Sequence, residues 1–486
     1  VYVRTIAYGF VYDDFQEIVM NPWVHSFRNW REILGNNFWA FAGMVGNYYR
    51  PMTSFWLAGN YSLFHSIPGW FHLTSIAAHV LATGLVYLLA CRLLNNRWTA
   101  VVAAALFGLN PIHVEPVSWI SSIPEILMAI FFIAAFLAFE RARESGRRSW
   151  VYVSAVVYGI GLLSKETAVA FLPVIAVWAW TRSEGQRARG WTWLGQMAPY
   201  ALVSAIYAGG RIYAIGGMDN PYFPRTWSSV VATWPAAMWV YVRGMLWPFP
   251  PQPSYNLDLV SQFSFSTVVL PLMLSVLGIA AVALIVRKKN LALLTVAWIV
   301  MPLVPALIGI RVFQWHDYAH DRYTYLSSVM VAIAMAYALQ QVSSRLETRR
   351  VQVAGAVVLA SAFAVTTVIS TGVWQDDRTL FTRAYQDAPK NPLTGVDLAQ
   401  AYAVDARYDD CIALLKTTLK DHPDYWQANY VLGLTYYNLG RFSEAEPYLD
   451  LASRTWMRQF EYPNGAQFYY LALAQEHNGH YQAAET

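Results

Sequence analysis

The chain has 486 residues and a formal net charge of +4, and 56% of its residues are hydrophobic whereas only 13% are charged. Soluble globular domains carry about 25% charged residues, so this composition excludes a purely soluble protein and predicts a polytopic membrane protein. The two cysteines, Cys91 and Cys411, lie in different parts of the sequence, which excludes a disulfide framework.

The first segment is marked by two adjacent carboxylates, in the stretch YGFVYDDFQEIVMNP (residues 8–22). Asp13 and Asp14 lie there among aromatic residues, which suit the boundary between water and lipid. We interpret residues 4–69 as a long first loop outside the membrane, which also holds Arg50 in NYYRPMTSFW (residues 47–56). We expect a first transmembrane helix upstream of Val1.

Apolar runs that approach the ~20 residues needed to cross a bilayer recur along the next part of the chain. With the helix expected upstream of Val1, the sequence predicts an all-α bundle of about eleven spans. The candidates visible in the sequence are residues 70–92, 98–111, 119–139, 150–163, 168–181, 194–213, 267–286, 291–310, 325–342 and 351–373. Residues 229–247 are apolar too, but prolines surround them, so we expect a re-entrant or interface-lying piece there.

Basic residues gather in five short loops, which the alternation of spans places on one face of the membrane. Short loops rich in Lys and Arg stay in the cytoplasm, so the first loop and the chain after residue 374 are predicted on the opposite face. The clusters are Arg92/Arg97, Arg141/Arg143/Arg147/Arg148, Arg182/Arg187/Arg189, Arg287/Lys288/Lys289 and Arg345/Arg349/Arg350.

Three further polar stretches fall on the face opposite the basic clusters. They are NPIHVEPVSW (110–119) with His113 and Glu115, LLSKET (162–167) with Lys165 and Glu166, and WHDYAHDRYTYL (315–326) with His316, Asp317, His320, Asp321 and Arg322. Each has a structural alternative: a helix cap, a mutual ion pair, or an arginine that extends to the interface. Together they suit transfer from an anionic lipid-linked donor, because a carboxylate can act as base and cations can hold a phosphate. The His and acidic residues also suit a divalent metal, but no His-Glu-x-x-His or similar spacing occurs. The sequence therefore neither establishes nor excludes a metal site.

The tail is predicted to be a separate soluble domain, residues 375–486, that holds half of the acidic residues of the chain. ARYDDCIALL, GRFSEAEPYL and GHYQAAET align Tyr408, Phe442 and Tyr481 at separations of 34 and 39 residues. A period of about 34 residues with an aromatic after a Gly/Ala turn is typical of tetratricopeptide (TPR) helix pairs, which stack into an α-solenoid with a peptide-binding concave face. The last repeat breaks off at Thr486, so we expect the natural protein to continue.

YGFVYDDFQEIVMNP, YYRPMTSFW, NPIHVEPVSW, LLSKET, HDRYTYL and the repeats occur in the order seen in a known family. The chain resembles C-type (GT-C fold) membrane glycosyltransferases with TPR repeats, namely the transmembrane-and-TPR O-mannosyltransferase-like proteins and their bacterial counterparts. The resemblance implies a polyprenyl-phosphate sugar donor and an inverting transfer. It also implies that Asp13 is the catalytic base, with Asp14 as its partner or substitute. The residues implied to line the donor headgroup pocket are Arg50, His113, Glu115, Lys165, Glu166 and Arg322.

The chain departs from the family pattern after VEPVSW. The family usually has a basic residue there, followed two positions later by Asp, whereas this chain has Ile123 and Glu125. The missing cation weakens the prediction of phosphate binding and is compatible with a different donor or with lost catalysis.

The leading interpretation is an enzyme that transfers a mannose-like sugar to a Ser or Thr hydroxyl of a protein at the outer membrane face. The alternative is a non-catalytic membrane scaffold whose repeats bind a partner complex; sugar transfer to a lipid would leave the repeats without a role. Expected partners are the lipid-linked donor, membrane lipids, and an acceptor or partner subunit on the TPR domain, but no nucleic acid. We expect a bacterial inner membrane rather than the endoplasmic reticulum, with the TPR domain outside the cytoplasm.

Overall fold

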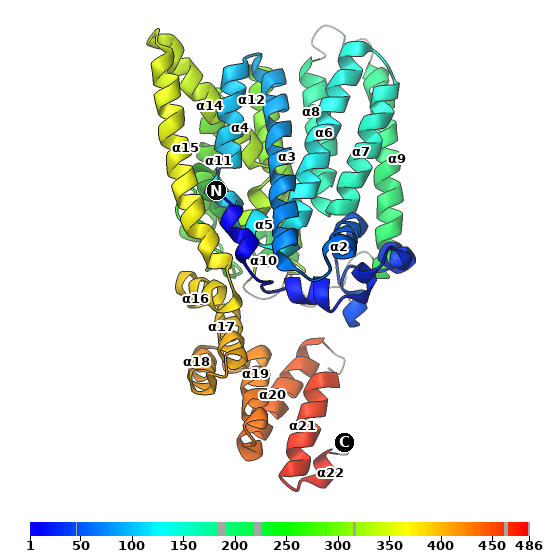
Figure 1. The fold of residues 1–486 in the computed structure, drawn as a ribbon, viewed down its shortest axis with the longest axis vertical. Helices are drawn as coiled ribbons and strands as arrows, with labels where there is room; N and C mark the ends of the chain where they lie inside the picture. Colours follow the sequence, from blue (N-terminus) through cyan, green and yellow to red (C-terminus); the bar gives the residue numbers. More distant parts are fainter. Residues whose placement is uncertain are drawn as a thin grey trace.

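The computed structural model describes residues 1–44, 46–182, 190–217, 225–286, 288–313, 317–460 and 465–484. These residues form helices and turns and contain no strand. Figure 1 shows a bundle of long, roughly parallel helices, with a smaller helical tail that extends from one end of it. The predicted all-α membrane bundle followed by a TPR solenoid is confirmed.

Each of the ten spans predicted from the sequence overlaps a helix or a pair of consecutive helices of the bundle, although some extend past the helix ends. These helices are α3 (Pro68–Leu94), α4 (Arg97–Gly108), α6 (Ile123–Ser145), α7 (Ser149–Ser164), α8 (Phe171–Arg182), α9 (Gly190–Ile215), α11 (Leu270–Ile285), α12 (Lys289–Val300) with α13 (Val304–Gly309), α14 (Ser328–Arg345) and α15 (Arg349–Thr371). Their inward sides share one continuous core, in which Phe136, Phe171 and Trp298 are fully buried.

By length and hydropathy, five helices in the described ranges are candidate membrane spans: Pro68–Leu94, Ile120–Ser145, Phe265–Ile285, Lys289–Gly309 and Arg349–Trp374. A sixth candidate combines α4 with the short helices at Pro111–Ser118, which are bent by 49° relative to it. The segment expected to be re-entrant or interface-lying forms a helix of 20 residues, α10 (Trp227–Leu246), that contains Pro235 and does not meet this criterion.

The two ends of the bundle differ in charge. The turns between α3 and α4, α6 and α7, and α14 and α15 carry basic clusters, and they lie at the end away from the tail (Figure 1). The first segment and the tail lie at the opposite end, as the alternation of spans predicts. The predicted residues Arg187, Arg189, Arg287 and His316 lie outside the described residues.

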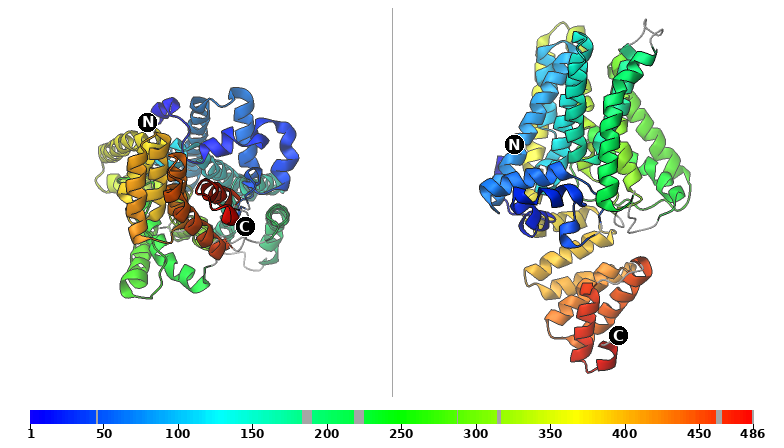
Figure 2. Two further views of the ribbon diagram at one scale, coloured as in Figure 1. Left: turned by 90° about the horizontal axis from the view of Figure 1, so that it is seen from below. Right: turned by 90° about the vertical axis from the view of Figure 1, so that its right-hand side faces the viewer.

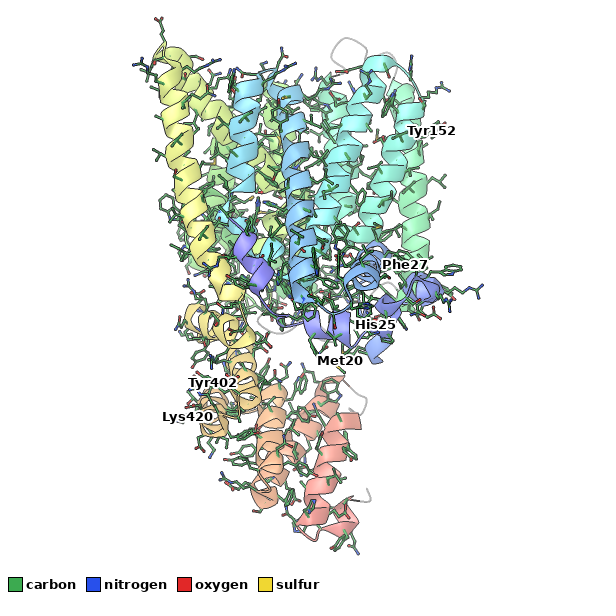
Figure 3. The ribbon with its side chains drawn as sticks, in the orientation of Figure 1. Met20, His25, Phe27, Tyr152, Tyr402 and Lys420 are labelled. Atoms are coloured by element: carbon green, nitrogen blue, oxygen red, sulfur yellow. The ribbon has the colours of Figure 1, made fainter. Side chains whose placement is uncertain are left out.

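The first segment is a chain of short helices with its own small core. Its elements are η1 (Val3–Ala7), η2 (Phe15–Val19), η3 (Pro22–His25), η4 (Phe27–Asn29), α1 (Trp30–Gly35), η5 (Ala40–Ala42) and α2 (Pro51–Phe64). Ile18, Val24 and Leu57 are fully buried there against Phe71 of α3. Figure 3 shows Met20 and His25 at the end of the bundle that faces the tail. Tyr402 and Lys420, which are labelled in the same figure, belong to the tail. This core fixes the position of the acidic pair.

The tail has the register that the repeat alignment predicts. Tyr408, Phe442 and Tyr481 each begin the second helix of a pair. After α16 (Asp377–Asp387), the pairs are α17 (Pro392–Val404) with α18 (Tyr408–Asp421), α19 (Trp426–Asn438) with α20 (Phe442–Phe460), and α21 (Gly465–His477) with α22 (Tyr481–Ala484) (Figure 2). Gly433 permits close packing, since a Cβ there would lie 2.7 Å from Leu449 Cγ.

The tail begins in contact with the bundle rather than on a free linker. The η13 turn (Gly372–Trp374) places the Trp374 ring on Trp119, with ring centroids 5.8 Å apart. Asn256 donates a hydrogen bond of 3.4 Å to the carbonyl of Asp387, at the end of α16. The predicted boundary after residue 374 falls between η13 and α16.

Candidate functional site

Asp14 is an anchor of the first segment. Its side chain is fully buried. One carboxylate oxygen accepts hydrogen bonds from the backbone N–H of Ser121 at 2.8 Å and from its hydroxyl at 2.6 Å, and the other accepts from the N–H of Val11 at 3.1 Å. Ser121 belongs to the η7 turn (Ile120–Ser122), which leads into α6. Asp14 therefore ties the acidic stretch to the bundle.

Asp13 has a different environment. It is partly exposed, and its side chain forms no hydrogen bond with the described part of the chain. Burial raises the pKa of Asp13 to about 7; the charge of Arg322 lowers it, and the charges of Asp317 and Asp377 raise it. A carboxyl with this pKa changes its charge near neutral pH, which suits a general base. Burial raises the pKa of Asp14 to about 7 as well, so the two acids differ in exposure and hydrogen bonding and not in pKa. Of the two predicted acids, Asp13 is the one with an available carboxylate.

Asp14→Ala is expected to loosen the first segment. The substitution leaves the N–H of Val11 and the buried N–H and hydroxyl of Ser121 without their acceptor, at a cost of about 3 kcal/mol. Hydrogen exchange across residues 8–22 should then be faster. Asp13→Ala is the matched control, because the Asp13 side chain makes no such bond. Equal exchange in the two variants would contradict the anchoring role.

Arg50 and Glu166 form a two-point ion pair. Arg50 immediately precedes α2, and its Nη2 and Nε donate to Glu166 at 2.7 and 3.1 Å. The guanidinium lies 4.1 Å from the ring centroid of Tyr48. Burial raises the pKa of Glu166, but the charge of Arg50 lowers it, and the resulting pKa is about 2. The pair therefore joins the first segment to the turn between α7 and α8 in its charged form.

Lys165 pairs with Glu125 of α6, not with its neighbour Glu166. Both side chains of this pair are nearly buried, with 5% and 3% exposed. The Lys165 ammonium also lies 4.7 Å from the centroid of the Tyr323 ring. Glu125 and Ile123 are the two residues at which this chain departs from the family pattern. Glu125 pairs with the lysine that was predicted to bind phosphate, and Ile123 is fully buried.

Arg322 is enclosed by one carboxylate and two aromatic rings. Its backbone N–H donates to Glu115 at 3.0 Å, and its guanidinium pairs with the same carboxylate. The rings of Trp119 and Tyr323 each lie 5.0 Å from the guanidinium carbon. The positive charge of Arg322 also lowers the pKa of Asp13, so a cation acts electrostatically on the available acid.

His113 lies apart from these ion pairs, in the interior. It is fully buried, its Nε2 lies 2.8 Å from the hydroxyl of Ser328, and its ring packs against Phe107 and Tyr325 with centroids 4.5 and 4.6 Å away. Glu115, two residues on, reaches Arg322. The structure therefore brings together five of the predicted donor-site residues, namely Arg50, Glu115, Lys165, Glu166 and Arg322, and separates His113 from them.

Several charged groups near Asp13 did not enter the predicted site. Glu17 is 4% exposed, and its Oε2 has no hydrogen-bond partner in the described part of the chain. Asp377 and Asp397 come from the tail. Burial raises the pKa of Asp397 most, and the charges of Asp317 and Asp13 raise it further. Asp317 stood in a quoted motif and Glu17 in the acidic stretch, whereas no local signal points to the two tail acids. Within the described ranges, no group of three or more His, Cys, Asp or Glu side chains could hold a metal ion.

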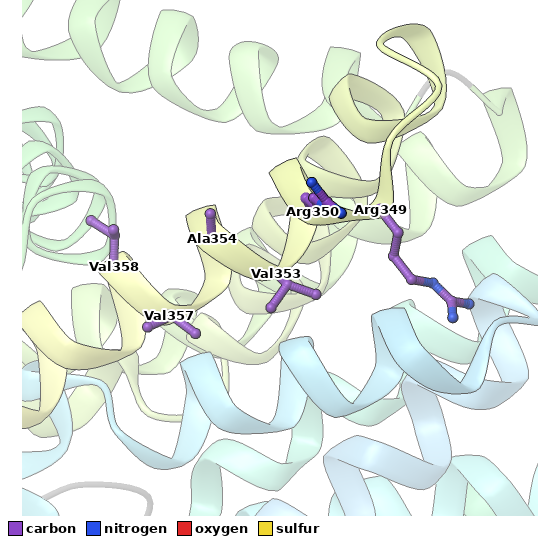
Figure 4. A pocket seen from close by; sticks show the side chains of 6 residues that line it. All are labelled: Arg349, Arg350, Val353, Ala354, Val357 and Val358. Atoms are coloured by element: carbon purple, nitrogen blue, oxygen red, sulfur yellow. The ribbon is translucent and has the colours of Figure 1, made fainter.

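Two hollows lie away from Asp13. A shallow apolar one of about 530 Å³ on α15 is lined by Arg349, Arg350, Val353, Ala354, Val357 and Val358 (Figure 4). A smaller one of about 170 Å³ lies between the end of α10, the proline-rich stretch after it and Asp321. Burial raises the pKa of Asp321 to about 7, and its carboxylate accepts from Tyr255 and from the N–H of Gln252 at 3.0 Å.

Comparisons with known proteins agree with the two-part organisation. Residues 50–207 match the family described as dolichyl-phosphate-mannose-protein mannosyltransferase, and residues 396–459 match the tetratricopeptide repeat. The chain is 30% identical to protein O-mannosyl-transferase Tmtc2 of Drosophila melanogaster over 249 residues, which are 47% of this chain and 26% of that protein. It is 22% identical to mouse TMTC3 over 92% of the chain and 52% of that protein, and 25% identical to human TMTC1 over 89% and 55%.

These relatives bear on the resemblance predicted from the motifs. The transmembrane-and-TPR O-mannosyltransferase-like organisation is confirmed. The chain spans about half, or less, of the length of these curated relatives. No solved structure matches the chain.

Proposed function

We propose that this chain, which has the two-part organisation of the transmembrane-and-TPR O-mannosyltransferase-like family, is a lipid-dependent protein glycosyltransferase. It transfers a mannose-like sugar from a polyprenyl-phosphate donor to a Ser or Thr hydroxyl of a protein. The observation that carries this proposal is the contrast within the acidic pair. Asp14 is bound by three hydrogen bonds, whereas Asp13 is partly exposed, has no side-chain hydrogen bond among the described residues and feels the charge of Arg322.

The reaction is a displacement with inversion at the anomeric carbon. The carboxylate of Asp13 takes the proton of the acceptor hydroxyl while the hydroxyl oxygen attacks that carbon. The bond between the carbon and the phosphate oxygen breaks, and the polyprenyl phosphate leaves with the electron pair. Negative charge that grows on the leaving phosphate is stabilised by a cation already in place, which is the role assigned to Arg322.

The donor headgroup is proposed to bind where the three ion pairs converge. Each cation there has a glutamate partner: Arg50 with Glu166, Lys165 with Glu125, and Arg322 with Glu115. A guanidinium has five N–H donors, so Arg322 can hold Glu115 and still donate to a phosphate. The glutamates keep the cations charged and oriented while the site is empty. No step is assigned to a divalent metal, and a chelator in the assay tests whether one takes part.

The chain is proposed to lie in a bacterial inner membrane with its TPR domain outside the cytoplasm. There the TPR domain presents the acceptor protein. The basic clusters at the far end of the bundle support this orientation, because such loops stay in the cytoplasm. Asp13 and the tail then share the outer side. The polyprenyl chain can remain in the lipid while the headgroup and the acceptor meet at the surface.

Transfer is expected to depend on pH through Asp13. Below its pKa of about 7 the carboxyl is protonated and cannot act as base, so kcat/KM should fall about tenfold for each pH unit. Above that pKa, kcat/KM should reach a plateau. The measurement is the initial rate with dolichyl-phosphate-linked mannose and a pool of Ser/Thr peptides. The rate is measured between pH 5 and 9, at about every half pH unit. A midpoint at the ordinary aspartate value near 4 would contradict this environment of Asp13.

A non-catalytic scaffold is the second candidate, and one observation favours it. All three predicted phosphate-binding cations already carry a carboxylate partner, and a buried Ile123 stands where the family has a cation. A scaffold would bind a partner through its repeats without consuming the donor. Release of dolichyl phosphate that depends on the peptide pool supports the enzyme; folded protein that releases none supports the scaffold.

A further inference from the structure

The first helix of the tail holds the residue that precedes Asp13. The backbone N–H of Tyr12 donates a hydrogen bond of 2.8 Å to Oδ1 of Asp377, at the start of α16. The Tyr12 ring packs edge-on against Phe381 of the same helix, with centroids 5.7 Å apart. The Tyr12 ring also lies beside the ring of Trp119, with centroids 5.5 Å apart. Tyr12 is therefore clamped between the tail and the bundle.

Tyr12 needs this support because of its backbone conformation. Its φ is +55°, in the left-handed region that residues with a Cβ rarely adopt. Such a conformation persists only when surrounding contacts hold it, and it costs about 1–3 kcal/mol. The next residue is Asp13, so the direction of the Asp13 carboxylate depends on this turn. The Asp14 bonds to Val11 and Ser121 hold the turn from the bundle side, and Asp377 holds it from the tail side.

We propose that Asp377 is a positioning residue for the catalytic base, so that the active site is complete only when the first helix of the tail is docked on the acidic stretch. This inference rests on the proposed function, in which Asp13 is the base. It gives the tail a role in the chemical step, in addition to presenting the acceptor. Nothing in the repeat pattern requires that role, since α16 precedes the first helix pair.

Asp377 also acts on Asp13 through its charge. Its negative charge is one of the influences that raise the pKa of Asp13. The charged and titratable groups that interact electrostatically with Asp13 are Arg322 and Asp317 before α14, Asp377 and Asp397 of the tail, and Tyr12, Asp14 and Glu17 of its own segment. Removal of the Asp377 charge should therefore make Asp13 more acidic, whatever happens to the turn.

Two substitutions separate the hydrogen bond from the charge. Asp377→Asn keeps an oxygen that can accept from Tyr12 and removes the charge; Asp377→Ala removes both. We expect Asp377→Asn to keep kcat within about threefold and Asp377→Ala to lose about 10- to 100-fold, because small displacements of a catalytic group are costly. In both variants the acidic limb of kcat/KM should move to lower pH. The shift of that limb reports the lost charge, whereas the difference in kcat between the two variants reports the lost hydrogen bond.

The matched control is Arg378→Gln, one residue further along α16. Arg378 pairs with Asp405 at 2.9 Å on the surface, with side chains 54% and 38% exposed. Its substitution should leave kcat and the pH limb unchanged. Hydrogen exchange provides a readout apart from activity: a peptide that contains Tyr12 should exchange faster in Asp377→Ala than in Arg378→Gln or the wild type.

The outcomes distinguish this inference from the proposed function. If Asp13→Asn is inactive but Asp377→Ala keeps the kcat of the wild type, only the positioning role of Asp377 is overturned, whether or not the pH limb moves. If the folded wild type transfers no mannose from either a dolichyl-phosphate or an undecaprenyl-phosphate carrier, the proposed function is overturned and the role of Asp377 with it. If Asp377→Asn loses as much kcat as Asp377→Ala, the hydrogen bond to Tyr12 is not what positions the base.

Discussion

Asp13→Asn is expected to lower kcat for sugar transfer by about 100- to 10,000-fold, the range that a general base contributes. The side chain is partly exposed and makes no hydrogen bond with the described part of the chain, so the amide should leave the fold unchanged. The loss should therefore appear in kcat rather than in the thermal stability or in the amount of folded protein. The measurement is single-turnover transfer from dolichyl-phosphate-linked mannose to a pool of Ser/Thr peptides.

Asp14→Asn is the matched control for this result. An asparagine oxygen can still accept from Ser121, but the amide nitrogen cannot accept from Val11. We expect a smaller loss of kcat, about tenfold, with faster hydrogen exchange in the first segment, because the base is then held less firmly. If Asp14→Asn abolishes transfer and Asp13→Asn does not, Asp14 is the base and Asp13 is not.

Lys165→Met is expected to lower the free energy of unfolding by about 3–5 kcal/mol, because it leaves the Glu125 carboxylate buried without its cation. The two side chains of this pair are 5% and 3% exposed. The double variant Lys165→Met/Glu125→Met should recover most of the stability, since a buried ion pair replaced by apolar side chains is often neutral. Thermal unfolding in detergent, followed by tryptophan fluorescence, measures both.

The double variant also tests the donor site. If Lys165 binds the donor phosphate, stability should recover while the KM for the donor stays raised. Arg92→Gln is the control, because Arg92 and Glu144 form a surface pair with side chains 35% and 47% exposed, and such pairs contribute about 0–1 kcal/mol. A Lys165→Met chain as stable as the wild type would contradict the buried pair.

Much of the fold followed from local sequence signals. The repeat register placed Tyr408, Phe442 and Tyr481 at the starts of α18, α20 and α22, because aromatic and small residues at a fixed spacing dictate how helix pairs pack. Apolar runs located the bundle helices, since lipid imposes length and composition. The bend of 49° after α4 was missed, because it depends on the Leu109–Asn110 break and not on hydropathy.

The candidate site was predictable in part. Arg50, Glu115, Lys165, Glu166 and Arg322 were found because ionisable groups beside membrane spans are costly and usually have a role. Their pairing was not predictable: sequence proximity suggests Lys165 with Glu166, whereas packing of α6 against the turn after α7 brings Glu125 to Lys165. His113 carried the same signal but points into the core, because the chain direction after α4 decides its burial. The contact between Tyr12 and Asp377 spans 365 positions and has no local pattern.

The most direct test of Asp13 as the base of an inverting transfer is the product that the purified chain forms in lipid nanodiscs from dolichyl-phosphate-linked mannose and Ser/Thr peptides. We expect mannose on a Ser or Thr oxygen with the anomeric configuration inverted relative to the donor, free dolichyl phosphate in equal amount, and loss of both products in Asp13→Asn. Retained configuration, or equal transfer by the wild type and Asp13→Asn, would contradict this role of Asp13.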